Sequence, residues 1–266
     1  MGNNNSGEKK MVSSKEMRSR IETVLAFLNQ NLRGKEEPIS LALLSAVAGQ
    51  NIILSGRSND DKEWIRSCID HAFQNRDPLY SSMDFSSEAY PENKENWALT
   101  VEVKPIADDN DFFHFVNTPF DTIQNPTKEQ KAALLTKDEV SEWQKLIDQV
   151  ELSEEAKKII SEIRRKCFDY YVSDTRWRRI IYVLKTCAFL NGRSKVDLID
   201  CLLIDYAIPN NFVEEILKRY AVESKLDSRQ HAQYKANIFT RHKYYGILKA
   251  SIDDTKLKLE HKDELY

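Results

Sequence analysis

The residues with the clearest chemical potential lie in one stretch, NIILSGRSNDDKE, which runs from Asn51 to Glu63. A short apolar strand leads through Gly56 into an amphipathic helix, and this order is the layout of a phosphate-binding loop. In such a loop, GxxxxGK[ST], backbone N–H groups cradle phosphate, the lysine neutralises its charge and the hydroxyl binds Mg²⁺. Gly56 and Lys62 hold the matching places and are the candidate nucleotide-binding residues.

Acidic side chains in the same stretch oppose that chemistry. Asp61 occupies the small-residue position before the lysine, and Glu63 replaces the hydroxyl that would bind Mg²⁺. With Asp60 they outnumber the two cations, and each carboxylate about 4 Å from a phosphate oxygen would cost on the order of 4 kcal/mol. The sequence therefore favours a solvated lysine at a helix start over a phosphate ligand at Lys62. At Gly56 it favours backbone freedom over phosphate contact.

The rest of the chain has no second catalytic or metal-binding pattern. The five histidines are scattered without an HExxH motif, and the four cysteines form no CxxC pair. We expect the cysteines to be buried thiols in a reducing cytosol. No catalytic residue and no metal ligand is predicted.

Composition limits the possible partners. The chain of 266 residues has a formal charge of −3 and a pI near 6.0, which gives no overall attraction for nucleic acid or for acidic membranes. No apolar run approaches the roughly 20 residues needed to cross a bilayer. We expect a soluble, cytoplasmic protein that binds neither nucleic acid nor membrane.

The elements that must position the loop are mostly helical. In the first half we expect a helix from Ser13 to near Gly34, a buried helix over 38–48, strands 51–55 and 97–106, the helix after the loop, and a short helix over 108–116. Residues 76–96 are polar and irregular, so only two strands are expected in the first 120 residues. In the second half we expect helices opened by the Thr136/Glu139 capping box, by Ser153 and by Ser173 or Asp174, and shorter helices over 196–207 and 210–222.

One long segment of this helical half resembles a known family. YVSDTRWRRIIYVLKTCAFLNGRSKVDLIDCLLIDYAI, residues 171–208, is similar to the lid subdomain of MoxR-branch AAA+ ATPases, particularly the RavA type. In that family Ser-Asp-Arg-Arg-Trp opens an apolar helix, which leads to Gly-Arg and a VDLxDxLLL helix. TKDEVSEWQKLIDQVELSEEAKKII resembles the preceding lid segment, VEVKPIADDNDFFHFV resembles the last core strand and its exit, and residues 20–75 resemble the family's opening.

The resemblance implies a mostly α chain with a small α/β part, in which a truncated P-loop AAA+-like remnant precedes an AAA+ lid-type helical domain. The expected divisions are a disordered tail (1–12), the α/β remnant (13–116), a linker (117–131), the lid-type domain (132–222) and a charged, partly helical C-terminal tail (223–266).

Two further departures from the family concern its catalytic machinery. Only residues 86–100 separate Phe85 from Val101, where the family holds its Walker B acidic pair, sensor 1 residue and arginine finger. Asp84 and its acidic neighbours follow no apolar strand, so none is a credible Walker B residue. The sensor 2 arginine of the lid falls at Thr175, and Arg176 beside it points about 100° away around a helix.

The sequence thus indicates a catalytically incomplete MoxR/RavA-like AAA+ relative that acts as a protein-interaction or regulatory module through its lid, without a cofactor. The resemblance implies protein partners such as an active AAA+ ring or a von Willebrand A-type protein, and it allows an oligomer. The alternative is a divergent AAA+ ATPase with chaperone-like remodelling activity, which would need ATP and Mg²⁺. A third possibility is an internal deletion of a full-length ATPase with no evolved function of its own.

Overall fold

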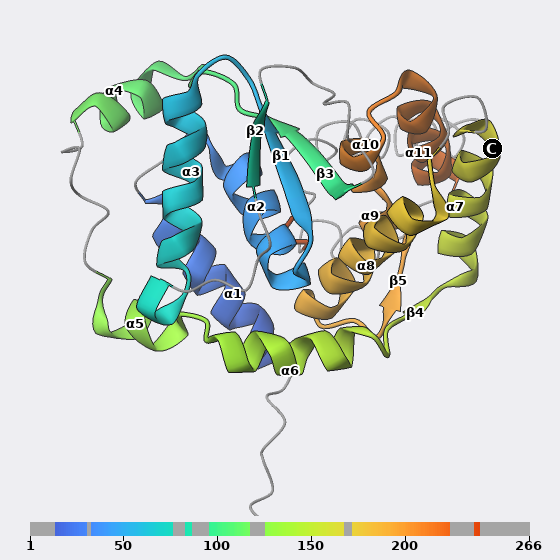
Figure 1. The fold of residues 1–266 in the computed structure, drawn as a ribbon, viewed down its shortest axis with the longest axis horizontal. Coiled ribbons are helices and arrows are strands. Elements are labelled where there is room, and N and C mark those ends of the chain that lie inside the picture. The colour runs from blue at the N-terminus through green and yellow to red at the C-terminus, as the bar shows by residue number, and fades with distance from the viewer. Residues whose placement is uncertain are drawn as a thin grey trace, which may run out of the picture.

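The computed structural model describes residues 14–30, 33–76, 83–86, 96–117, 126–167, 172–223 and 237–239 (Figure 1). The helices are α1 (Ser14–Asn29), α2 (Glu36–Ala48), α3 (Asn59–His71), α4 (Asp109–Asn117), α5 (Lys128–Ala133), α6 (Lys137–Ile147), α7 (Glu154–Lys166), α8 (Asp174–Leu190), α9 (Leu198–Cys201), α10 (Ile204–Ala207) and α11 (Asn211–Glu223), with one 3-10 turn, η1 (Gln74–Arg76). The strands are β1 (Asn51–Ser55), β2 (Met83–Ser86), β3 (Trp97–Glu102), β4 (Glu151–Leu152) and β5 (Lys195–Val196). The predicted fold class, mostly helical with a small α/β part, is confirmed.

A parallel sheet with the order β2-β1-β3 forms the centre of the first half. Leu54 of β1 pairs with Phe85 on one side and with Val101 on the other. The prediction of only two strands is wrong, because β2 lies inside the segment that the sequence analysis treated as irregular. Its four residues MDFS gain their strand structure from hydrogen bonding to the buried β1 and not from an apolar run of their own.

The helical half covers this small sheet directly. Helix α2 packs against β1 and β3, and α8 and α10 also pack against β3 (Figure 1). One hydrophobic cluster runs without a break from Met17 in α1 to Phe239. The lid-type helices therefore supply cover that a three-stranded sheet lacks, since parallel strands need both faces buried.

The local structure follows the predicted helix caps but not the predicted end of β3. Thr136 and Ser153 cap their helices as expected, and Ser173 is the N-cap of α8. The strand predicted over 97–106 ends at Glu102, and the pairing of β4 with β5 was not predicted. All four cysteines are free and buried, as expected for thiols in the core. None of the helices in the described ranges is long and apolar enough to cross a membrane. Ser13 and nearly all of the predicted tail beyond Glu223 lie outside the described residues.

Candidate functional site

The junction between β1 and α3 is too short to form a phosphate cradle of the usual kind. Strand β1 ends at Ser55 and α3 begins at Asn59, so the loop consists of Gly56, Arg57 and Ser58. In a GxxxxGK[ST] motif the helix opens at the GK[ST] residues, and the x positions before it form the loop whose N–H groups face phosphate. Here the last two x positions, Asn59 and Asp60, already belong to α3. Here the hydroxyl of Ser58 accepts the Asp61 N–H at 3.1 Å, so one first-turn donor already has a partner.

Gly56 is required by its backbone contact with the end of the sheet. Its φ of +129° lies in the region that favours glycine, and a Cβ at this position would lie 2.7 Å from the Val103 carbonyl oxygen. The Val103 N–H in turn donates to the Ser55 carbonyl at 2.8 Å. The close approach of the loop to the strand exit therefore explains this glycine without any phosphate.

Lys62 is 0% exposed and interacts with other groups inside the protein. The interpretation of this residue as a solvated lysine is wrong, because α3 starts three residues before it and turns its side chain into the core. On α3 it lies three and seven residues before the buried Ile65 and Ile69, which share its face of the helix. To contact a nucleotide, its ammonium group would have to leave this environment.

The acidic residues of the loop are already engaged or face solvent. Lys35, only 4% exposed, donates from Nζ to Asp61 at 3.1 Å and also to the Lys104 carbonyl. Glu63, at the Mg²⁺-ligand position, is exposed and pairs with Arg66. Lys35 thus ties the start of α2 to the first turn of α3, a role that no motif in the sequence signals.

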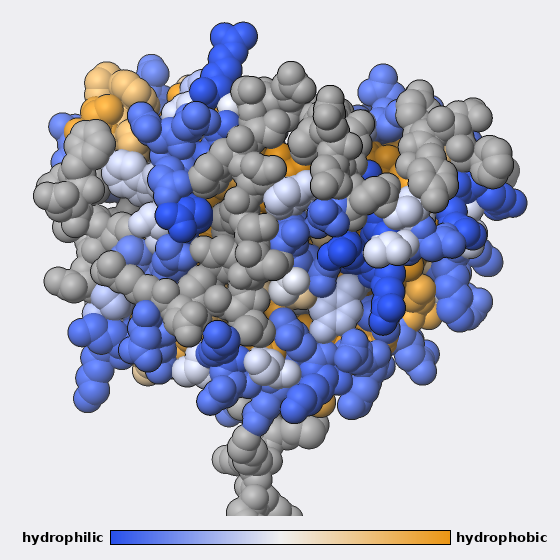
Figure 2. Space-filling model, viewed as in Figure 1, coloured by the Kyte–Doolittle hydropathy of each residue, from blue (hydrophilic) through white to orange (hydrophobic). Residues whose placement is uncertain are grey.

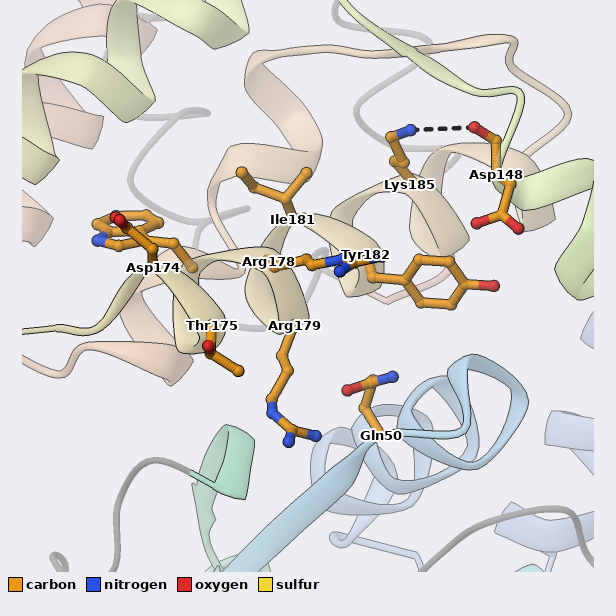
Figure 3. Close-up of a pocket in the computed structure, with 10 residues that line it drawn as sticks. Gln50, Asp148, Asp174, Thr175, Arg178, Arg179, Ile181, Tyr182 and Lys185 are labelled. Atoms are coloured by element: carbon orange, nitrogen blue, oxygen red, sulfur yellow. Dashed lines mark hydrogen bonds between the residues drawn. The ribbon is translucent and has the colours of Figure 1, made fainter.

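The lid candidates lie at the start of α8. Thr175 is exposed and lines a hollow of about 700 Å³, in which Arg179 points toward Gln50 and Lys185 donates to the Asp148 carbonyl at 3.2 Å (Figure 3). Arg176 is 8% exposed and has a structural role. Its guanidinium donates to the carbonyls of Ala207 at 2.7 Å and of Trp97 at 3.4 Å, which joins α8 to α10 and to the start of β3.

The structure places the two candidate pairs at opposite ends of the sheet. Gly56 follows the carboxyl end of β1, where ligands of parallel α/β sheets bind. The hollow beside Thr175 instead includes Gln50, which precedes β1, and Arg176 bonds to Trp97, which pairs with the first residue of β1. A five-residue strand spans about 16 Å, so the lid candidates do not face the loop.

The Gly-Arg and VDLxD motifs of the lid have a structural explanation that the sequence analysis did not give. Arg193 forms two 2.6 Å hydrogen bonds to the carboxylate of Asp200, which is 0% exposed and also accepts the Asp197 N–H at 2.9 Å. Burial by itself would lower the pKa of Arg193, but the charge and hydrogen bonds of Asp200 outweigh it and raise that pKa. The pair fixes the loop after α8 against α9.

Across the described residues, no three His, Cys, Asp or Glu side chains are grouped as a metal site would need.

Comparisons with known proteins agree with this architecture. Residues 155–216 match the family model of an AAA lid domain. The structure is similar to that of a candidate ATPase from Cytophaga hutchinsonii, with a TM-score of 0.50 and 13% identity over 84% of this chain and 94% of that one. The chain is therefore AAA+ ATPase-like in fold, with a small parallel sheet followed by a lid domain.

Proposed function

We propose that this chain is a catalytically incomplete AAA+ relative of the MoxR/RavA type, which acts as a protein-interaction or regulatory module and not as an ATP hydrolase. The subtype is supported by the lid sequence over 171–208. The loss of catalysis is supported by one observation above all. Only three residues separate β1 from α3, so Lys62 lies in the core and the phosphate-loop residues do not form a cradle.

Phosphoryl transfer needs a metal ion, a positioned nucleophile and positive charge held together around the γ-phosphate. The candidate loop offers the exposed carboxylates of Asp60 and Glu63, and Arg176 is committed to two backbone carbonyls. A nucleotide at the loop would thus meet negative charge from α3 and no arginine from the start of α8.

The test is isothermal titration of the purified full chain with ATP and Mg²⁺, together with a thermal-shift scan. We expect no binding tighter than about 100 μM, which corresponds to roughly 5.5 kcal/mol. The variant D60N/E63Q separates charge from geometry. If repulsion were the only obstacle, neutralising these exposed carboxylates would restore binding, whereas a loop without a cradle should gain nothing. Tight ATP binding by the wild type, abolished in Lys62→Met, would contradict the proposal and favour an ATPase.

The partners that fit this proposal are an active AAA+ ring or a von Willebrand A-type protein in the cytoplasm. The tagged full chain should retain such a protein from an extract of its own cells, as identified by mass spectrometry. Its addition to the purified ring should change the rate of ATP hydrolysis by the ring. An unchanged rate at saturating chain would argue against a regulatory role.

A further inference from the structure

Helix α4 presents an apolar face to solvent. None of its nine residues is buried, and Phe112, Phe113 and Val116 are 44%, 59% and 52% exposed. These side chains form the apolar patch above α4 at the upper left of Figure 2. With Asp109 they follow the spacing i, i+3, i+4, i+7, which aligns them along one side of the helix. We call Asp109, Phe112, Phe113 and Val116 the α4 face. A contiguous exposed apolar stripe of this kind is typical of an interaction site.

A hollow of about 190 Å³ lies beside the α4 face, between α4 and α3. Its lining is apolar at Trp64, Ile106, Phe112 and Phe115, and the ion pair of Lys35 with Asp61 forms its polar side. The rings of Trp64 and Phe115 lie 5.3 Å apart, so the two helices hold its shape together. The hollow has room for one bulky apolar side chain, which is the usual anchor of a helix bound in a groove.

Carboxylates lie at the starts of the two helices that form this surface. Asp109 and Asp111 are in the first turn of α4, Asp108 precedes it, and Asp60 is in the first turn of α3. Within the described ranges no ion pair forms at Asp60, Asp109 or Asp111. The surface is therefore apolar with an acidic rim, which complements a cationic amphipathic partner and disfavours an anionic lipid surface.

We propose that the α4 face binds an amphipathic helix of a partner protein, with a bulky apolar residue in the hollow and lysine or arginine residues along the acidic rim. This inference rests on the proposed interaction function and names its docking surface. The surface lies on the α/β part of the chain, whereas the sequence analysis predicted docking through the lid. It also lies near the carboxyl end of the sheet, beside the first turn of α3. The carboxylate of Asp60, which would repel a nucleotide, therefore adds to the negative charge that would attract this partner.

The probe is a fluorescein-labelled 14-residue helix of leucine and lysine, with leucines at i, i+3, i+4 and i+7, and its matched leucine/glutamate counterpart. Fluorescence anisotropy with the full chain should show binding of the lysine peptide that is at least about tenfold tighter than that of the glutamate peptide, and weaker at high salt. The variant F113A/V116A should weaken binding about 30-fold, as expected when apolar anchors are removed. D109N/D111N should weaken it about tenfold.

Asp138→Asn is the matched control, because Asp138 is also an exposed acidic residue in the first turn of a helix, far along the chain in α6. It should leave the affinity within about twofold. The altered α4 side chains are largely exposed, so all variants should keep the wild-type melting temperature. The proposal is overturned if the lysine peptide does not bind, if both peptides bind equally, or if F113A/V116A binds like the wild type.

A different occupant would also be recognised. If sedimentation shows a wild-type dimer that dissociates in F113A/V116A, the α4 face is an interface between copies of this chain and a partner helix is the wrong assignment. Failure of the peptide to bind would leave the ATP titration untouched, and ATP binding would contradict the proposed function without changing the peptide result. The two proposals can therefore fail separately.

Discussion

Replacing Asp200 by asparagine should destabilise the chain by about 3–5 kcal/mol, because the change breaks a buried ion pair inside the lid. Asp200 has no exposed surface, and both of its oxygens accept 2.6 Å hydrogen bonds from Arg193. Asparagine keeps the size but turns an NH₂ group toward the guanidinium, so that donor faces donor. The charge of Arg193, whose side chain is only 20% exposed, then loses the carboxylate that pairs with it directly.

A double-mutant cycle separates the value of the pair from the cost of breaking it. Arg193→Met leaves the Asp200 carboxylate with the Asp197 N–H and should also cost about 3–5 kcal/mol. In R193M/D200N neither buried charge remains, and the amide oxygen at position 200 can still accept the capping-box bond from the Asp197 N–H. The double variant should therefore be more stable than either single variant.

Urea unfolding followed by tryptophan fluorescence and circular dichroism measures these differences. At about 2–4 °C per kcal/mol, Asp200→Asn should lower the melting temperature by about 10 °C. Glu151→Gln is the control, because it removes an exposed ion pair with Lys195, at 3.3 Å, from the neighbouring β4–β5 contact. This change should leave the midpoint almost unchanged. Additive losses in the double variant, or equal losses in Asp200→Asn and Glu151→Gln, would refute the assignment of a coupled buried pair.

Three further outcomes follow from local geometry. Gly56→Ala should lower the free energy of unfolding by at least about 2 kcal/mol, because its methyl group would meet a backbone carbonyl, and more than Gly34→Ala, whose methyl would meet a movable side chain at 3.1 Å. None of the four cysteines should react with a thiol reagent at pH 8 before the chain unfolds, since burial raises the pKa of Cys68 to about 12 and raises the pKa of the other three thiols; rapid labelling of the native chain would contradict this. The hydrogen bond from Arg219 lowers the pKa of Glu162, so its stabilisation is present above the unfolded pKa near 4.3 and is lost as the pH falls through the lowered value. Glu162→Gln should thus cost less than about 1 kcal/mol at pH 7, and a difference from wild type that persists in urea titrations near pH 2 would be inconsistent with this linkage.

Much of the helical half could be predicted from capping and periodicity, because these are local properties. Ser153 accepts the Ala156 N–H at 3.0 Å and opens α7 as predicted. Strand β2 was missed because MDFS is short and its pairing partners are distant in sequence. In retrospect, Met83 and Phe85 alternate with polar residues, which is the pattern of a short strand. The end of β3 before Pro105 was equally open to prediction, since proline has no N–H for a ladder.

The sites were harder to predict because two cations that looked available for chemistry lie on buried helix faces. Lys62 shares its face of α3 with Ile65, and Arg176 lies four residues before the buried Ile180 on α8. Both positions follow from the residue at which each helix begins. The composition of the loop does not determine the first residue of α3, but the N-cap hydrogen bond to Ser58 does. The acidic neighbours of Lys62 suggested an exposed side chain, and that prediction was wrong. Its helical spacing from Ile65 would have predicted a buried one.

The start of α3 is stabilised by groups of the protein itself. In a phosphate loop the anion satisfies the N–H groups and the positive end of the helix that follows. Here Ser58 caps α3, and the carboxylates of Asp60 and Asp61 occupy its first turn, where negative charge is favourable. Asp61 is held in turn by the buried Lys35. The protein thus places its own anions at the start of α3, and under the proposed function these same carboxylates oppose the binding of a nucleotide there.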